Sequence, residues 1–475
     1  MVGLFSACSD DFLETSPTNQ ISDADVFLSV QGCQTVLDGV LRDMRAFRGS
    51  HDQFGVKAID HALDLMGEDM IQANHHHFGW DYKLDNNQAT YRRPGYVWSQ
   101  FYRIINNVNN IIVNIDDATG TDPARKANVK AQALALRGYA YHNLAENFQQ
   151  TYAADPNAPG VPIYLEPTTE GNPRVPLNQV YAQSISDLDQ AIELMTQNPY
   201  SRRHISDINL NVAHGLRARV ALYMQDWDNA RDHAAAARQG VNLNTRAHFA
   251  AGFDNHQTQS WMWGLEINDE QSTIYASLFS HLDMSVAGYT GLNLAPKLAS
   301  RAMYEQMMDG DIRKELIGPY TIAAGVPYDL VNLKFNAGQG KEFAADYVMM
   351  RPEEMLLIEA EARWQLDDFS GAAGLLEELW DRRFEEAPAV PAGGQELLDA
   401  ILFDRRIELW GEGFRMRDIR RLQIPLDRTG SNHTDYSNSP LYLELPANSP
   451  LFIYQIPQSE IDNNPNMSST DQNPL

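Results

Sequence analysis

Two segments of the chain carry the same pattern at a constant offset. Residues 218–230 and 360–372 match in order, and their aspartates, Asp226 and Asp368, lie 142 residues apart. In each segment a helical stretch leads into an aspartate, an aromatic residue follows directly, and an alanine comes four residues after the aspartate. This pattern predicts a pair of helices joined by a tight turn. A single pair cannot cover its own apolar face, so it must stack on neighbouring pairs.

Other parts of the chain also have the period of an α-helix. Apolar residues recur every three or four positions between Ile104 and Ile115, which predicts an amphipathic helix. A second helix is predicted over about 124–148, because Asp122-Pro123 is a suitable cap and first turn. A third is predicted over about 177–195. The fold class is therefore mainly α, with tetratricopeptide-like helical hairpins forming one scaffold.

Long loop-rich stretches separate these helical blocks, at residues 72–95, 155–176, 240–292 and 317–345. They are rich in Gly, Pro, Asn and aromatic residues. Residues 261–267 alternate in a way that predicts one short strand, so we expect only minor β structure. Loops of this length within a compact body usually carry function.

The charge balance excludes some partners. The chain has 37 Lys and Arg against 63 Asp and Glu, a formal net charge of −26. Such a surface repels phosphate backbones and anionic headgroups, so we predict no nucleic-acid binding and no direct membrane binding. The sequence has no run of eighteen apolar residues, so no membrane-spanning helix is predicted.

The first residues predict a different kind of membrane attachment. An apolar stretch, two small residues and Cys8 are followed by the polar sequence Ser9-Asp10-Asp11, as at the end of a lipoprotein signal peptide. We predict that residues 1–7 are a signal remnant whose upstream part is missing, that Cys8 carries the lipid, and that 8–24 form a tether. Residues 25–475 are then a single body. The other cysteine, Cys33, lies in a helical stretch and is predicted to be a buried free thiol.

Spaced motifs in the C-terminal third resemble the SusD/RagB family of outer-membrane nutrient-binding lipoproteins. They are the segments 347–362, 404–422 and 456–466 with Gln472-Asn473-Pro474. The resemblance extends to most of the chain through the lipidation motif, the helix with Trp98, Tyr102, Asn106 and Asn110, and the segment Asp309-Gly310-Asp311-Ile312-Arg313.

The resemblance implies a scaffold of tetratricopeptide-like helix pairs with a shallow ligand site built from loops. An N-terminal family part would cover about 25–240 and a C-terminal part about 260–475. Family members bind oligosaccharides, and some bind peptides, on the extracellular side of the outer membrane. They form a lid on a partner SusC-like TonB-dependent transporter. None is known as a catalyst.

Charged residues of these C-terminal motifs have a structural interpretation. We expect Arg351 to pair with Glu353, and Arg405 and Arg406 to pair with Glu408 and Glu412, so that helix is fixed against helix. Bidentate arginine–carboxylate pairs supply orientation as well as energy.

No motif predicts catalysis or a cofactor. The sequence lacks a His-Glu-x-x-His helix, a Gly-x-Ser-x-Gly elbow and a phosphate loop. The three adjacent histidines at 75–77 cannot readily converge on one ion, so a solvated loop is predicted there. The acidic segment 309–311 lacks further calcium ligands, and a turn between helix and strand is predicted. We therefore predict no enzyme activity and no metal site.

Aromatic residues in the loops are the better candidates for ligand binding. Sugar rings present flat apolar faces that stack on Trp and Tyr, while their hydroxyls form hydrogen bonds with polar side chains. Residues 78–87 combine both types, and we select Trp80, Tyr82 and Asn86, with Tyr289 from the loop at 275–289. The alternative is that Trp80 and Tyr82 only pack their loop onto the body.

The sequence leaves four candidate functions. The preferred one is capture of oligosaccharides for a partner transporter, and the second keeps this role with peptides as ligand. A tetratricopeptide adaptor for protein partners predicts fewer long loops than this chain has. A glycosidase is the fourth, and 63 acidic residues make chance carboxylate pairs uninformative.

Overall fold

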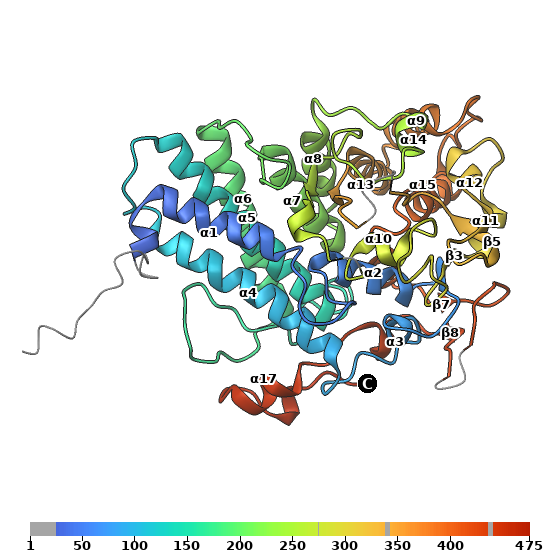
Figure 1. Ribbon diagram of the computed structural model, residues 1–475. Coiled ribbons are helices and arrows are strands. Elements are labelled where there is room, and N and C mark those ends of the chain that lie inside the picture. The colour runs from blue at the N-terminus through green and yellow to red at the C-terminus, as the bar shows by residue number, and fades with distance from the viewer. Residues whose placement is uncertain (1–24, 274, 338–342, 436–439) are drawn as a thin grey trace, which may run out of the picture.

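The computed structural model describes residues 25–273, 275–337, 343–435 and 440–475. Figure 1 shows a body made mostly of helices, with irregular segments and short strands gathered on one side. Cys8 and the proposed tether lie outside the described residues. No helix in the described part is both long and apolar enough to cross a membrane.

A continuous stack of helices forms the scaffold. In chain order, α4 packs on α5, α5 on α6, α6 on α7, α7 on α8, α8 on α13, and α13 on α14 and α15. The stack therefore continues from α8 to α13 although the residues between them leave it. Its helices are α4 (Arg92–Asn114), α5 (Pro123–Phe148), α6 (Leu177–Gln197), α7 (Leu210–Met224), α8 (Trp227–Arg238), α13 (Pro352–Gln365), α14 (Phe369–Arg383) and α15 (Gly394–Glu408).

The repeated pattern corresponds to two equivalent hairpins, α7/α8 and α13/α14, which confirms the predicted fold class. Gln225 and Asp367 both adopt left-handed backbone conformations, with φ of 60° and 62°. The next residue, Asp226 or Asp368, then caps the second helix by accepting a hydrogen bond from the backbone N–H three residues on. The same turn chemistry at both places explains why the pattern repeats in the sequence.

The helices predicted over about 124–148 and 177–195 are confirmed as α5 and α6, while α4 begins at Arg92, well before the apolar pattern that starts at Ile104. Asp122 caps α5 through the Arg125 N–H, and Pro123 occupies its first turn. Gly138 lets α6 approach closely, since a Cβ atom there would lie 2.9 Å from the Ser184 carbonyl oxygen. Small residues in α5 thus permit the tight α5–α6 contact.

The segments outside the stack are less regular. They include the short helices α1 (Val30–Asp43), α2 (Val56–Met66), α3 (Gly79–Tyr82), α9 (Arg246–Phe249), α10 (Leu278–Leu282), α11 (Arg301–Gln306), α12 (Ile312–Glu315), α16 (Arg415–Arg421) and α17 (Gln458–Asn463). Single 3-10 turns lie at Asp25–Leu28, Asp269–Gln271, Pro450–Phe452 and Ser469–Asp471.

Three small antiparallel sheets hold these segments together. One has the order β1-β3-β5-β4 and the others pair β2 with β6 and β7 with β8. The strands are β1 (Met70–Gln72), β2 (Trp263–Leu265), β3 (Lys297–Ala299), β4 (Ile317–Thr321), β5 (Pro327–Asn332), β6 (Tyr347–Met350), β7 (Leu426–Asp427) and β8 (Glu444–Leu445).

The strand expected within residues 261–267 is therefore present as β2. The stretch 317–345, which the sequence predicts as loop, instead contains the hairpin β4–β5. Pro319 and Pro327 within the strands obscured the alternating pattern.

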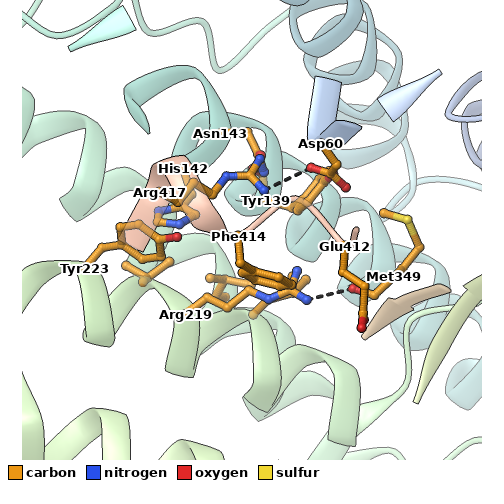
Figure 2. A pocket seen from close by; sticks show the side chains of 13 residues that line it. Asp60, Tyr139, His142, Asn143, Arg219, Tyr223, Met349, Glu412, Phe414 and Arg417 are labelled. Carbon is orange, nitrogen blue, oxygen red and sulfur yellow. Dashed lines mark hydrogen bonds and ion pairs between the residues drawn. The ribbon is translucent and has the colours of Figure 1, made fainter. Parts of the chain in front are cut away.

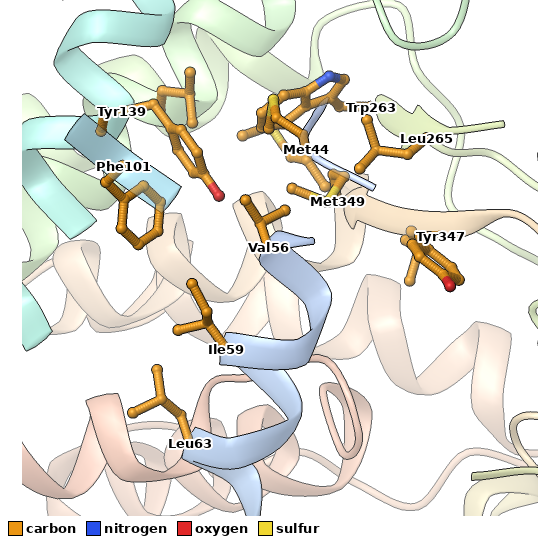
Figure 3. Close-up of a cluster of buried hydrophobic side chains, with 14 of the residues drawn as sticks. Met44, Val56, Ile59, Leu63, Phe101, Tyr139, Trp263, Leu265, Tyr347 and Met349 are labelled. Atoms are coloured by element: carbon orange, nitrogen blue, oxygen red, sulfur yellow. The ribbon is translucent and has the colours of Figure 1, made fainter. Parts of the chain in front are cut away.

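The helix α2 connects the scaffold to this irregular side. Its apolar residues Val56, Ile59 and Leu63 are buried between Phe101 and Tyr139 of the stack and residues of β2 and β6 (Figure 3). Cys33 is fully buried on α1 and is a free thiol, as predicted.

The charged C-terminal motif forms a buried charge cluster of Arg351, Arg383, Glu353, Glu408 and Glu412. The cluster joins α13, α14, α15 and the segment after α15. Arg351 donates to Glu408 at 2.9 Å and Glu412 at 2.7 Å, and Arg383 donates to Glu408 at 2.7 Å and Glu353 at 3.1 Å. All five side chains are at most 5% exposed.

The pairing predicted for Arg405 and Arg406 is wrong. Arg405 pairs with Asp418 at 2.9 Å, and Arg406 pairs with Asp69 at 2.5 Å. The single carboxylate of Glu408 is instead bound by Arg351, Arg383 and Arg313. The expected role, fixing one element against another, is the observed one.

Candidate functional site

Trp80 and Asn86 lie together in an exposed cavity of about 280 Å³. Tyr91 and Arg92 complete its lining, and we call it the Trp80 pocket. Trp80 belongs to the single turn α3, Asn86 to the loop that follows, and Arg92 to the first turn of α4. The indole of Trp80 is 41% exposed and Tyr91 is 39% exposed, so both rings can meet a ligand.

Buried polar contacts beneath this pocket fix its loop. Asp81 and Arg93 form a bidentate pair with N–O distances of 2.9 and 2.8 Å. Asn86 donates to the same Asp81 carboxylate at 3.1 Å. The ring of His75 meets the face of Trp80 edge-on, with centroids 4.5 Å apart. The pocket is therefore held by groups that are themselves fixed.

Asp52 links this pocket to a neighbouring cluster of rings. Its carboxylate accepts from Arg92 at 2.8 Å and Arg93 at 3.3 Å. Burial alone would raise the pKa of Asp52, but Arg93, the Ser50 hydroxyl and Arg92 together lower it well below its usual value. Asp52 thus stays ionised and holds one edge of the Arg92 guanidinium, whose side chain remains 53% exposed.

Tyr289 is at the centre of this ring cluster, in which it contacts His51, His77 and Tyr275. Its hydroxyl lies 2.7 Å from His77 Nε2 and 2.7 Å from His51 Nδ1, so it donates to one ring and accepts from the other. Burial is the main cause that lowers the pKa of His77, to about 4, so this imidazole is neutral near pH 7. Tyr275 stacks on His51 at 5.9 Å and is 39% exposed.

The four candidates chosen from the sequence therefore have different positions. Trp80 and Asn86 share the pocket. Tyr289 is only 7% exposed, and its hydroxyl is engaged by the two histidines, so it supports the neighbouring cluster and does not line the pocket.

Tyr82 is fully buried and cannot offer its ring to a ligand in this structure. Its hydroxyl lies 2.9 Å from His433 Nδ1, and the Arg428 guanidinium lies over its ring at 5.0 Å. In a helical turn, residues two apart point in nearly opposite directions, so an exposed Trp80 places Tyr82 inside. The sequence shows two aromatics but not which face of α3 is covered.

Sequence reasoning missed Tyr91 and Arg92. Both fall within the stretch 72–95 that the sequence predicts as loop, whereas Tyr91 directly precedes α4 and Arg92 is its first residue. Their proximity to Trp80 depends on how the loop folds back. Of the three adjacent histidines, His75 contacts Trp80, whereas His76 and His77 both contact Tyr289. In the described residues, no group of three or more His, Cys, Asp or Glu is arranged to hold a metal ion.

The acidic segment 309–311 is a turn, although the element that follows it is α12 and not a strand. Asp311 caps α12 and pairs with Arg313 at 2.6 Å, and Asp309 pairs with Lys314 at 2.6 Å. These carboxylates are therefore engaged in local structure.

A second cavity lies inside the molecule between α5, α7 and the segment before α16. Figure 2 shows its polar lining, in which Arg417 binds Asp60 at 2.9 Å and Arg219 donates to the Met349 carbonyl at 2.7 Å. Its volume of about 30 Å³ has room for about one water molecule. It is too small for a saccharide or a peptide.

Comparison with known proteins agrees with the fold. A family model described as "Starch-binding associating with outer membrane" matches residues 11–222, and the "SusD family" model matches 324–475. The chain is 25% identical to SusD-like protein P2 of Formosa agariphila, with 90% of both chains covered.

Solved structures show the same relationship. A SusD-like carbohydrate-binding protein from Bacteroides vulgatus is 29% identical and superposes with a TM-score of 0.84, covering 94% of this chain and 98% of the other. Surface glycan-binding protein A from Bacteroides thetaiotaomicron, solved with laminarihexaose, has a TM-score of 0.71 at 16% identity, covering 93% and 99%. At that identity only the fold is compared. With both family models matched and the same helical fold, this chain belongs to the SusD/RagB family.

Proposed function

We propose that this protein captures oligosaccharides at the cell surface and delivers them to a partner SusC-like TonB-dependent outer-membrane transporter. The observation that carries the proposal is the Trp80 pocket. It combines two exposed aromatic rings with an amide and a guanidinium, the groups that stack on sugar faces and bind sugar hydroxyls. A glycan as ligand is supported by the family model described as starch-binding, which matches residues 11–222, and by the fold neighbour that was solved with laminarihexaose.

The lining of the pocket supports binding without catalysis. Glycoside hydrolysis generally requires two carboxyl groups that flank the scissile bond. Among the four described residues that line the pocket, none is an aspartate or a glutamate. We therefore propose a binding protein and not a glycosidase.

Titration calorimetry with a panel of oligosaccharides and peptides tests the ligand class. We expect an oligosaccharide to bind, and Trp80→Ala to weaken it by about 2 kcal/mol or more, roughly 30-fold, because a ring anchor is lost. Trp364→Phe, on α13 outside the pocket, is the control. Binding of peptides alone would show that the ligand class is wrong, and unchanged affinity in a folded Trp80→Ala variant would place the site elsewhere.

The attachment and the partner form a second part of the proposal. We propose that Cys8 carries the lipid, with residues 1–7 as signal remnant and 8–24 as tether, and that the protein faces outward from the outer membrane. Cys8→Ser in the full-length precursor should move the protein to the soluble fraction and abolish palmitate labelling, while Cys33→Ser should change neither.

Gentle detergent extraction of native membranes tests the partner. A lid on a barrel must form an interface larger than the roughly 1,000 Å² that separates specific contacts from crystal packing. We therefore expect a large barrel protein to co-purify with this chain. Recovery as a lone monomer, with normal growth when the neighbouring barrel gene is deleted, would contradict the proposed partnership.

A further inference from the structure

A larger cavity, of about 490 Å³, lies along α4 beyond the Trp80 pocket. We call it the α4 groove. One wall is α4, another is the segment 164–171, and the third is the end of α17 (Figure 1). Its volume falls in the range of about 300–1,000 Å³ that is usual for ligand sites. Its lining includes Trp98, Tyr102, Tyr164, Glu166, Glu170 and Glu460.

The α4 groove is separate from the Trp80 pocket. The two cavities share no lining residue. Arg92 in the pocket and Tyr102 in the groove are ten residues apart on the same helix, which corresponds to about 15 Å along its axis. A ligand group in one cavity therefore leaves the other accessible.

Three aromatic rings form the apolar part of the groove. Trp98 and Tyr102 have ring centroids 4.8 Å apart, and Tyr164 meets Tyr102 edge-on at 5.7 Å. Trp98 itself is mostly buried, whereas the two tyrosines are partly exposed. The rings thus offer a small apolar surface on one side of the cavity.

Hydrogen bonds fix the tyrosines before any ligand arrives. The Tyr102 hydroxyl donates to the Pro162 carbonyl at 2.7 Å. The Tyr164 hydroxyl accepts from the Asn172 N–H at 2.9 Å, and its backbone carbonyl accepts from Asn109 and Tyr141. Pre-ordered side chains lower the entropy cost of binding.

The polar part of the groove is acidic and has amides beside it. Glu166, Glu170 and Glu460 all line it, and in the described part of the chain no Lys or Arg forms an ion pair with any of them. One guanidinium group, that of Arg103, also lines the groove, and Arg174 lies near Tyr102; both are engaged elsewhere. Arg103 pairs with Asp43 at 3.2 Å, and Arg174 donates to backbone carbonyls.

The position of Glu460 also brings its charge close to the tyrosines. It accepts from Asn464 at 2.8 Å through one oxygen. Burial is the main cause that raises the pKa of Tyr164, and the Glu460 carboxylate adds to it. A carboxylate beside ring faces is suited to sugar hydroxyls or to a cation, and it repels an anion.

We propose that the α4 groove is a second saccharide site, specific for neutral and amino sugars and closed to acidic ones. Stacking on Tyr102 and Tyr164 supplies the apolar contact, and the three glutamates accept hydrogen bonds from hydroxyl or ammonium groups. The proposal uses the glycan-binding role but does not depend on the Trp80 pocket. A glycan long enough to reach both sites would bind more tightly than either site alone allows.

The test uses glucose, glucosamine and glucuronate as probes, with ligand-observed saturation-transfer NMR on the Trp80→Ala protein. Removing the pocket ring leaves the groove as the site to be detected. We expect signals for glucosamine and glucose and none for glucuronate. The additional change Tyr164→Ala should abolish the signals. Glu166→Gln together with Glu170→Gln should reduce the preference for glucosamine over glucose about threefold, because two exposed carboxylates that attract the ammonium group are lost.

Three results would overturn the proposal. They are the absence of any signal in Trp80→Ala, equal signals with and without Tyr164, and binding of glucuronate as strong as that of glucosamine. Thermal unfolding of each variant shows that it is folded, and the exposed glutamate variant tests the charge argument even if Tyr164→Ala unfolds. If the Trp80 pocket is not the ligand site, calorimetry shows unchanged affinity in Trp80→Ala. The NMR tests of the α4 groove do not depend on that result.

Discussion

The buried charge cluster and the Trp80 pocket both contain arginine, but the arginines differ in burial and in how many carboxylates bind them. In the cluster, Arg351 is fully buried and its guanidinium binds three carboxylates. In the pocket, Arg92 is 53% exposed and is held at one edge by Asp52. The difference indicates that the segment richest in charged motifs is structural, while the proposed ligand site has few charges and accessible rings.

The physical reason is desolvation. A guanidinium taken out of water must recover its lost hydration from partners, and the cluster supplies them completely. Partners that are already engaged cannot also bind a ligand. Mutations in the two regions should therefore separate stability from binding.

The largest expected effect is on the cluster. Glu408→Gln removes the carboxylate that Arg351, Arg383 and Arg313 share and leaves buried positive charge underpaired. We expect a loss of about 3–5 kcal/mol in the free energy of unfolding, measured by urea denaturation, with ligand affinity unchanged in the folded protein. A loss below about 1 kcal/mol would mean that the cluster contributes far less than its burial indicates.

The next effect separates two neighbours on α3. Tyr82→Phe removes a buried hydroxyl that contacts His433 and accepts from the Thr434 N–H at 3.1 Å, so we expect a loss of about 1–3 kcal/mol in stability. Trp80→Phe, on the exposed face of the same turn, should stay within about 0.5 kcal/mol. Thermal denaturation measures both, and equal losses would contradict the opposite roles assigned to them.

The sequence predicts the local parts of the fold well and the contacts between distant segments poorly. The hairpins and the helices α4, α5 and α6 are predictable, because helical periodicity, caps and turns are local properties of the chain. The pair of Arg351 with Glu353, two residues apart, is likewise predicted and present at 3.0 Å. The partner of Arg406 is not predictable in this way, since Asp69 lies 337 residues from it and the pairing depends on how distant elements pack. Which face of α3 is covered depends on distant segments in the same way.

A third prediction concerns pH. Burial raises the pKa of the Glu408 and Glu412 carboxyls, but their cationic partners lower it by more. The net pKa of each carboxyl is therefore below its usual value, and the cluster stays charged in mild acid.

His142 behaves differently. Burial and then Arg417, Arg219 and Arg420 lower its pKa to about 3. Below pH 6.5 the unfolded chain binds a proton at this residue that the folded protein does not, so stability falls as the pH falls from 6.5 towards 3. His142→Gln should reduce this slope by up to about 1.4 kcal/mol per pH unit, measured by urea denaturation at pH 6 and pH 4. His248→Gln, at an exposed side chain, is the control, and identical slopes for His142→Gln and the parent protein would refute the assignment.

The smallest effect tests whether burial, and not ion pairing itself, makes the cluster important. Arg203 pairs with Asp38 at 2.8 Å, but the two side chains are 35% and 49% exposed. Water already solvates both charges, and ordering the flexible arginine side chain costs entropy, so the pair adds little to the free energy of unfolding. Arg203 also contacts Asp207, which is nearly buried, so Asp38→Asn is the cleaner change. We expect Asp38→Asn to alter the free energy of unfolding by at most about 1 kcal/mol, and less in high salt, where exposed charges are screened. A loss comparable to that of Glu408→Gln in the same urea titration would show that the exposed pair is as important as the buried one, and the contrast between cluster and surface would then fail.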